Sequence, residues 1–208
     1  MKIGIVGSGN IGGMAARLFV NAGHEVAIAN SRGPESLDDL VAELGDGARA
    51  ATPEQAVEFG DAVILAIPWR LREQLPDARL FEGKITIDAM NPYSEDFQVI
   101  DLEPSSSSEE VEKQLKGARL VKALNHLRAS DLGDAGRPGG GDERAVLFMA
   151  GDDEDAKQVV GRLIADIGFA AVDTGDLATG GRLQQPGSKL YIQVITEAQA
   201  PEALRDLP

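Results

Sequence analysis

Residues 2–32 decide the fold, and they read KIGIVGSGNIGGMAARLFVNAGHEVAIANSR. The apolar run at 3–6 has the length and branching of a buried strand. A glycine-rich turn follows it, residues 14–20 have the pattern of a helix, and residues 25–29 predict a second strand. Strand, glycine turn, helix and strand in this order form the unit that binds a dinucleotide in doubly wound folds. The alternative is a tight turn that binds nothing.

Each glycine of the motif has its own physical task. Gly7 permits the tight turn out of the strand, Gly9 lets the backbone approach a pyrophosphate, and Gly12 allows the helix to pack near the strand. The pyrophosphate would lie on the unpaired N–H groups at the positive end of the helix predicted over 10–20. The motif therefore predicts a dinucleotide site.

The end of the second predicted strand selects between NAD and NADP. NAD-binding units usually place Asp or Glu about 20 residues past the glycines, where it holds the ribose 2′-OH. Residues 29–32 read ANSR and contain no carboxylate. The Ser31 hydroxyl and the Arg32 guanidinium suit a 2′-phosphate, which a carboxylate would repel. The sequence favours NADP(H); the alternative for Arg32 is a solvated turn residue.

The composition excludes several function classes. The chain has 208 residues, a net charge of -14 and no cysteine. An acidic chain does not attract nucleic acid or an anionic membrane, so we expect neither partner. Disulfides, thiolate catalysis and Cys-ligated metals are excluded. No apolar run approaches the roughly 18 residues of a membrane span, and the first residues read as a strand rather than a signal peptide, so we expect a cytoplasmic protein.

Strand and helix patterns alternate along the chain. They predict a Rossmann-type doubly wound parallel sheet, with an NADP-binding domain over 1–124. A small C-terminal α+β domain over 125–208 is expected to complete the acceptor site. Further strands are expected at 48–51, 62–67, 84–88, 119–124, 145–150 and 169–172. Helices are expected from Ser36 as N-cap to 44, after Thr52-Pro53, at 70–75, after Ser105–Ser108, at 152–167 and at 189–200, and a glycine-rich loop at 133–141.

Three side chains follow strands at the edge of the sheet where ligands bind. Trp69 would either form a wall for the nicotinamide or cover the sheet edge. Asn91 would either present its amide to the nicotinamide or cap a turn. His126 is the candidate proton donor or acceptor, its alternative being a simple hydrogen-bonding residue. His24 precedes the second strand, at the opposite edge, and is expected to be structural.

No metal-ligand pattern occurs in the sequence, neither a spaced pair of histidines nor a cluster of acids, so we expect no metal. No lysine has an obvious catalytic setting at the ligand edge either. Hydride transfer between two cofactors needs little acid–base help and fits this set of residues.

Several segments resemble the NADPH:coenzyme F-420 oxidoreductase family, which is related to the reductase domain of the STEAP metalloreductases. The resemblance runs in order through nearly the whole chain. Its segments are the glycine turn with Asn10, Ser31-Arg32, AIPW at 66–69, DAMNP at 88–92, VKALN at 121–125, MAGDD at 149–153, and DTGDL at 173–177 through GRL at 181–183.

The resemblance implies roles for individual residues. The pyrophosphate would be held by Ser8, Gly9, Asn10 and Ile11, and the 2′-phosphate by Ser31 and Arg32. The nicotinamide would be flanked by Pro68, Trp69 and the segment Leu124–Leu127, which includes Asn125; Ile67 and Asn91 complete the expected cofactor-binding set. Family members often carry a basic residue shortly after the arginine. This chain has Glu35 and Ser36 there, which should weaken phosphate binding.

These observations together predict an enzyme, an oxidoreductase that transfers a hydride between NADPH and a small-molecule acceptor. The expected acceptor is the deazaflavin coenzyme F-420 or a flavin such as FMN. The alternatives are an NADPH-dependent reductase of a small imine or carbonyl compound and a non-catalytic NADP(H) sensor. We expect a homodimer, because a small sheet domain leaves one side of its cleft open.

Overall fold

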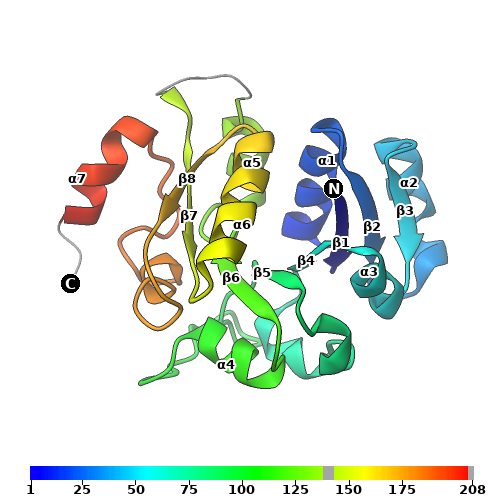
Figure 1. The fold of residues 1–208 in the computed structure, drawn as a ribbon, viewed down its shortest axis with the longest axis horizontal. Helices are drawn as coiled ribbons and strands as arrows, with labels where there is room; N and C mark the ends of the chain where they lie inside the picture. The colour runs from blue at the N-terminus through cyan, green and yellow to red at the C-terminus, as the bar shows by residue number, and fades with distance from the viewer. Residues whose placement is uncertain (138–142, 206–208) are drawn as a thin grey trace.

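An eight-stranded sheet forms the centre of the computed structural model, which describes residues 1–137 and 143–205 (Figure 1). The strand order is β3-β2-β1-β4-β5-β6-β7-β8. The strands are β1 (Lys2–Val6), β2 (Glu25–Ala29), β3 (Ala48–Ala51), β4 (Ala62–Leu65), β5 (Ile85–Asp88), β6 (Arg119–Ala123), β7 (Val146–Ala150) and β8 (Ala170–Asp173). The α-helices are α1 (Asn10–Asn21), α2 (Asp38–Leu44), α3 (Pro53–Phe59), α4 (Ser107–Gln114), α5 (Ala129–Ala135), α6 (Glu154–Asp166) and α7 (Ala200–Arg205).

The sheet confirms the predicted doubly wound fold. Strands β1 to β6 pair in parallel, and the order reverses direction between β1 and β4, which places the switch point of the sheet beside the glycine turn. Strand β7 pairs antiparallel with β6, and β8 runs parallel to β7. The C-terminal residues therefore extend the same sheet. The domain division at residue 124 stays a prediction.

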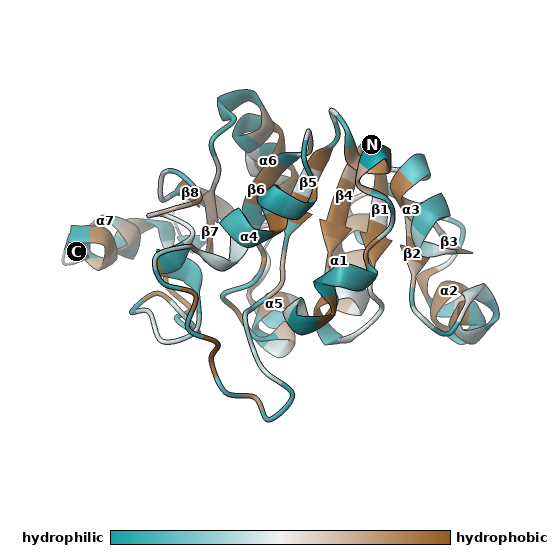
Figure 2. Cartoon of the chain, turned by 90° about the horizontal axis from the view of Figure 1, so that it is seen from below, coloured by the Kyte–Doolittle hydropathy of each residue, from teal (hydrophilic) through white to brown (hydrophobic). Residues whose placement is uncertain are grey.

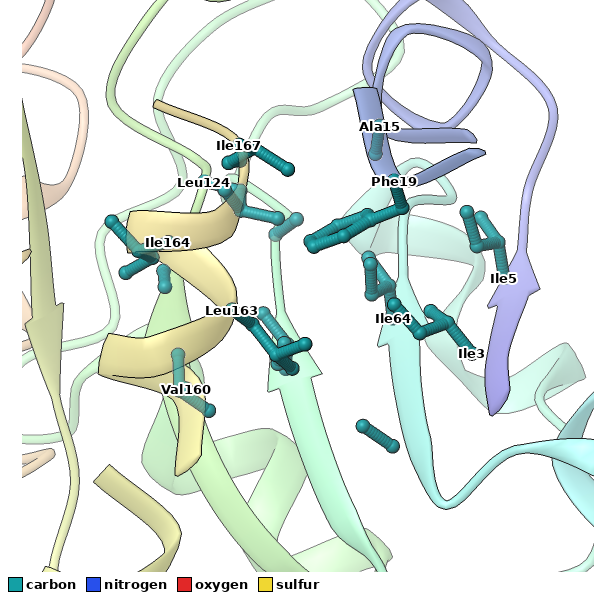
Figure 3. Packing of buried hydrophobic residues seen from close by; sticks show 14 of the residues in the cluster. Ile3, Ile5, Ala15, Phe19, Ile64, Leu124, Val160, Leu163, Ile164 and Ile167 are labelled. Atoms are coloured by element: carbon teal, nitrogen blue, oxygen red, sulfur yellow. The ribbon is translucent and has the colours of Figure 1, made fainter. Parts of the chain in front are cut away.

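Apolar residues on the two faces of the sheet form two main core clusters. Figure 3 shows the first, in which Phe19 of α1 and Leu163 of α6 lie between the strands and the helices. The second cluster packs α3, α4 and the turn after β4 on the opposite face, and includes Trp69 and Phe81. Both faces of the central strands are thus covered, as the continuous apolar run at 62–65 predicts. Figure 2 shows the central strands hydrophobic and most of α4 hydrophilic.

Two helices begin at capping residues that the sequence indicates. Thr52 and Ser106 each form a capping box, with Gln55 and Glu109 respectively. Ser36 is predicted to be an N-cap, and the structure shows that it is not. It lies within a 3₁₀ turn (Pro34–Leu37), and its hydroxyl donates to the Gly33 carbonyl oxygen at 2.7 Å.

One other local prediction is confirmed in position but not in helix type, and two are wrong. The segment expected as a helix at 70–75 is a 3₁₀ helix (Trp69–Gln74), and most of 189–200 is irregular, with a 3₁₀ turn (Glu197–Gln199) before α7. Residues 133–135 belong to α5 and not to a loop. Residues 136 and 137 have no regular structure, as expected, and the remainder of the expected glycine-rich loop, 138–141, lies outside the described residues. Among the described residues, no helix is long and apolar enough to cross a membrane.

Candidate functional site

Two glycines of the turn between β1 and α1 are required by packing. Gly7 has φ 113°, and a Cβ there would lie 2.4 Å from the Ala66 carbonyl oxygen. A Cβ on Gly12 would lie 1.8 Å from the Gly7 carbonyl oxygen. Gly9 is different, because its φ of -70° is accessible to any residue and a Cβ there would meet no protein atom within 4 Å. The space in front of Gly9 is therefore open for a ligand.

The N-terminus of α1 carries the partial positive charge of the helix dipole, and neither a side-chain cap nor an acid in the first turn offsets it. Gly9 is its N-cap, no side chain caps it, and its first turn contains no acidic residue. Each of the other α-helices in the described residues has at least one acid in its first turn. The free N–H groups and the helix dipole at α1 thus favour an anion in front of Gly9.

Two cavities meet at Ser8 and Gly9. The first, which we call the Arg32 cavity, has a volume of about 420 Å³ and lies between the ends of β2 and β4. The second, the Asn125 cavity, has a volume of about 830 Å³ and lies between α1, α5 and the ends of β5 and β6. A ligand that crosses the glycine turn would extend into both.

A polar network orders the loop beside the Arg32 cavity. Asn30 Nδ2 donates to Ser8 Oγ at 3.2 Å, and the Arg32 backbone N–H donates to Asn30 Oδ1 at 2.8 Å. The Arg32 side chain is exposed and makes no ion pair or side-chain hydrogen bond with the described residues. Its guanidinium is therefore available to an anionic ligand at the mouth of this cavity.

Asn91 and Asn125 face the other cavity. Asn91 Nδ2 donates to the Asn125 carbonyl oxygen at 2.8 Å, and Asn125 Nδ2 donates to Asn91 Oδ1 at 3.0 Å and to the Gln184 carbonyl oxygen at 2.9 Å. Asn125 Oδ1 is buried and has no hydrogen-bond partner among the described residues. A buried acceptor without a partner costs free energy unless a ligand donates to it.

A buried ion pair holds the chain just before Asn91. Lys122 Nζ lies 3.1 Å from Asp88 Oδ2 and donates to the Met90 carbonyl oxygen at 2.6 Å, with both charged side chains fully buried. Asp88 also accepts from Ser108 Oγ at 2.6 Å and from the Met90 backbone N–H at 3.0 Å. Burial lowers the pKa of Lys122, and the Asp88 carboxylate opposes that shift. These bonds fix the end of β5 and with it the position of Asn91.

Comparisons with known proteins agree with this geometry. Residues 2–92 match the family model described as NADP oxidoreductase coenzyme F420-dependent. A hypothetical protein of known structure from Sinorhizobium meliloti is 36% identical, with a TM-score of 0.83 over 94% of this chain and 95% of the other. The chain belongs to the coenzyme F420-dependent NADP oxidoreductase family.

Other proteins also resemble the chain over most of its length. A structure from Arthrobacter sp. FB24, assigned as an F420-dependent NADP-reductase, is 27% identical over 88% of this chain and 89% of that one, with a TM-score of 0.75. Metalloreductase STEAP3 of Rattus norvegicus is 28% identical over 88% of this chain. The chain spans 36% of the length of that curated relative.

The structure divides the family's expected cofactor residues between the two cavities. Gly7, Ser31, Arg32, Ile67 and Pro68 line the Arg32 cavity. Asn10, Ile11, Asn91 and Asn125 line the Asn125 cavity, and Ser8 and Gly9 line both. Ile67 and Pro68 thus lie beside the candidate phosphate ligands and not beside Asn91. The sequence did not indicate this placement.

Four expected site residues lie in the protein core and line neither cavity, and one of them is Gly12, which packs against the Gly7 backbone. The Trp69 indole is buried and donates from Nε1 to the Ser107 carbonyl oxygen at 3.0 Å. Leu124 is buried at the end of β6 with φ 64°, a conformation that costs a non-glycine residue free energy and is often found beside functional sites. The His126 ring is fully buried, with its centroid 5.0 Å from that of Phe148.

Burial also determines the charge of His126. It lowers the pKa of the imidazole to about 4, against a small opposing contribution from the Val146 backbone. Neither ring nitrogen makes a hydrogen bond of normal geometry within the described residues. The ring is therefore neutral at pH 7. Its position gives no support to proton exchange with a ligand in the cavity.

Among the residues that line the Asn125 cavity, Arg128 and Tyr191 are two polar ones that sequence reasoning missed. Arg128 lies shortly after the end of β6 at the ligand edge, so its position in the sequence could have indicated it. Tyr191 lies in the segment wrongly expected to be a helix, and no local pattern points to it. In the part of the chain that the structure describes, no cluster of His, Cys, Asp or Glu could hold a metal ion.

Proposed function

We propose that the chain is an oxidoreductase that transfers a hydride between NADPH and a deazaflavin or flavin-like acceptor. The observation that carries this proposal is the pair of cavities that meet at Gly9, in front of the uncapped N-terminus of α1. A dinucleotide has one charged centre and two flat ends, and this arrangement offers an anion site between two hollows.

The Arg32 cavity fits the adenosine end of NADP(H). Its Arg32 side chain is a cation without a partner among the described residues, beside the Ser31 hydroxyl, in a chain of net charge -14. A guanidinium can form two hydrogen bonds with a phosphate, and no carboxylate lines this cavity to repel one. The 2′-phosphate would lie here.

The Asn125 cavity fits the nicotinamide end together with the acceptor. The buried acceptor atom Asn125 Oδ1 is suited to the amide N–H group of the nicotinamide. The hydrogen bonds between Asn91 and Asn125 hold that atom in place. When bound, NADPH supplies a hydride from its nicotinamide ring. With a volume of about 830 Å³, the cavity has room for a second flat ring beside the nicotinamide.

The test is to mix the protein with NADPH and either coenzyme F-420 or FMN without oxygen, and to follow the nicotinamide absorbance. We expect reduction of the deazaflavin, or of FMN, in proportion to protein concentration. Reduction of neither, by a protein that binds NADPH, would overturn the proposal and leave the sensor alternative. The homodimer and the cytoplasmic location stay predictions; sedimentation equilibrium would check the first.

A further inference from the structure

Tyr191 reaches the Asn125 cavity from the irregular C-terminal segment. The Ile192 backbone N–H donates to the His126 carbonyl oxygen at 2.7 Å, and this bond ties the segment to the residues that follow β6. Ile192 has φ 60°, an unfavourable conformation for a β-branched residue, so its surroundings must hold it there. The Tyr191 side chain lines the same cavity as Asn91 and Asn125.

The Tyr191 hydroxyl has a free proton to donate. Tyr93 Oη donates to Tyr191 Oη at 3.2 Å, so the Tyr191 hydroxyl accepts one bond and can donate another. Burial raises the pKa of Tyr191 well above its usual value. The phenol therefore stays protonated over the physiological pH range.

Arg128 places a positive charge beside this phenol. It lines the Asn125 cavity and is exposed, and its side chain makes no ion pair or hydrogen bond with the described residues. Its charge acts on Tyr191, whose pKa it lowers slightly against the larger shift above. The other arginine of the cavity, Arg17, is paired with Glu43. Arg128 is thus the cation of the cavity that a ligand can use.

We propose that Tyr191 and Arg128 bind the hydride acceptor at the atom on which negative charge develops during the transfer. Tyr93 supports Tyr191 through the hydrogen bond between their hydroxyl groups. The acceptor class is a conjugated, electron-poor ring with a carbonyl oxygen or ring nitrogen in conjugation with the atom that receives the hydride. This inference rests on the proposed function and assigns its acceptor side to these residues.

The chemistry accounts for both groups. As the nicotinamide C–H bond breaks with its electron pair, a bond to hydrogen forms on the acceptor ring, and an electron pair of the ring moves to the conjugated oxygen or nitrogen. A donated hydrogen bond and a nearby cation stabilise that charge more than they stabilise the neutral ring. The proton that completes the reduction comes from water, so Tyr191 keeps its own.

The test compares Tyr191→Phe, Tyr93→Phe and Arg128→Gln with a control, Arg162→Gln, which removes the same charge from the exposed face of α6. For Tyr191→Phe we expect kcat/KM for the acceptor to fall about 10- to 100-fold, with the Kd of NADPH within about twofold of wild type. Tyr93→Phe should lose less, because the Tyr191 hydroxyl remains. Arg128→Gln should mainly raise the KM of the acceptor.

A second readout does not need turnover. Fluorescence titration with FMN in the presence of NADP⁺ should show weaker flavin binding in Tyr191→Phe and Arg128→Gln than in wild type and Arg162→Gln. If Tyr191→Phe reduces the acceptor and binds flavin as well as wild type does, the inference is overturned and the proposed function stands. A wild-type protein that binds FMN but transfers no hydride would overturn the proposed function, while the titration still decides the role of Tyr191. A loss of NADPH binding and thermal stability in Tyr191→Phe would show a structural role and also overturn the inference.

Discussion

Asn91 and Asn125 are bound to each other twice, by the 2.8 Å bond from Asn91 Nδ2 to the Asn125 carbonyl oxygen and the 3.0 Å bond from Asn125 Nδ2 to Asn91 Oδ1. These bonds join the ends of β5 and β6 at the wall of the Asn125 cavity. Every polar atom of the two side chains except Asn125 Oδ1 has a protein partner, so a ligand that donates a hydrogen bond to this buried atom would satisfy it.

Asn125→Ala should affect ligand binding in only one of the two halves of the dinucleotide site. We expect it to weaken NADP⁺ binding but not the binding of adenosine 2′,5′-bisphosphate, which would occupy only the Arg32 cavity. The change also removes the donor to Asn91 and Gln184, which should cost about 1–3 kcal/mol of stability. Calorimetric titration with both ligands checks this. Equal weakening for both would contradict the placement of the nicotinamide.

Arg32→Ala should weaken NADPH far more than NADH. The lost bond is charge-assisted, so the difference should be on the order of 1.5–3 kcal/mol. Binding of adenosine 2′,5′-bisphosphate should weaken by a similar factor, unlike in Asn125→Ala. Arg162→Ala serves as the charge control, since Arg162 is exposed on α6. If NADPH and NADH lose equal affinity, Arg32 does not hold the 2′-phosphate.

Gly9→Ala and Gly12→Ala should have opposite effects. A methyl group on Gly9 meets no protein atom within 4 Å, so the variant should melt like wild type yet bind NADPH more weakly. A methyl group on Gly12 would collide with the Gly7 backbone, so this variant should lose stability. Thermal melts with and without NADPH distinguish the two. Unchanged NADPH affinity in Gly9→Ala would place the pyrophosphate elsewhere.

His126 should make the fold sensitive to acid. Its pKa is about 4 in the folded state, against 6.5 for an ordinary histidine in the unfolded chain, so the unfolded chain binds a proton first as the pH falls. The contribution of the neutral His126 ring to the free energy of unfolding is fully present above pH 6.5. It is lost as the pH falls toward 4, by at most about 3 kcal/mol.

The measurement is denaturant unfolding of wild type and His126→Phe between pH 7 and pH 4. The variant should lose less stability across this range. The chain has two histidines, and burial lowers the pKa of His24 too, so a His24→Gln background isolates the contribution of His126. The same pH dependence in His126→Phe would contradict the explanation.

Lys122→Met should be strongly destabilising, by about 3–5 kcal/mol, because it leaves the Asp88 carboxylate buried without its cation. Adding Asp88→Asn should restore part of the loss, since the uncompensated charge is removed. A double-mutant cycle by denaturant unfolding measures the coupling. Additive losses would show that the pair does not act as a unit.

Local sequence determined the dinucleotide-binding unit. Residues 2–32 fold as expected because strand, turn and helix there depend on neighbouring residues, on apolar period and on the small size of Gly7 and Gly12. The parallel pairing of β1 to β6 follows from the alternation of strands and helices, and the caps at Thr52 and Ser106 follow from their own residues. The presence of Arg32 at the end of β2 is likewise a fact of sequence.

Only the tertiary structure decided which side chains face the ligand. His126 and Arg128 lie two positions apart, yet the first is buried against Phe148 and the second lines the cavity, because strand β7 pairs with β6 and covers one side. Tyr191 meets Tyr93 across 98 residues of sequence. Its segment forms little regular secondary structure, so its path depends on long-range bonds such as that between Ile192 and His126, which no local pattern encodes.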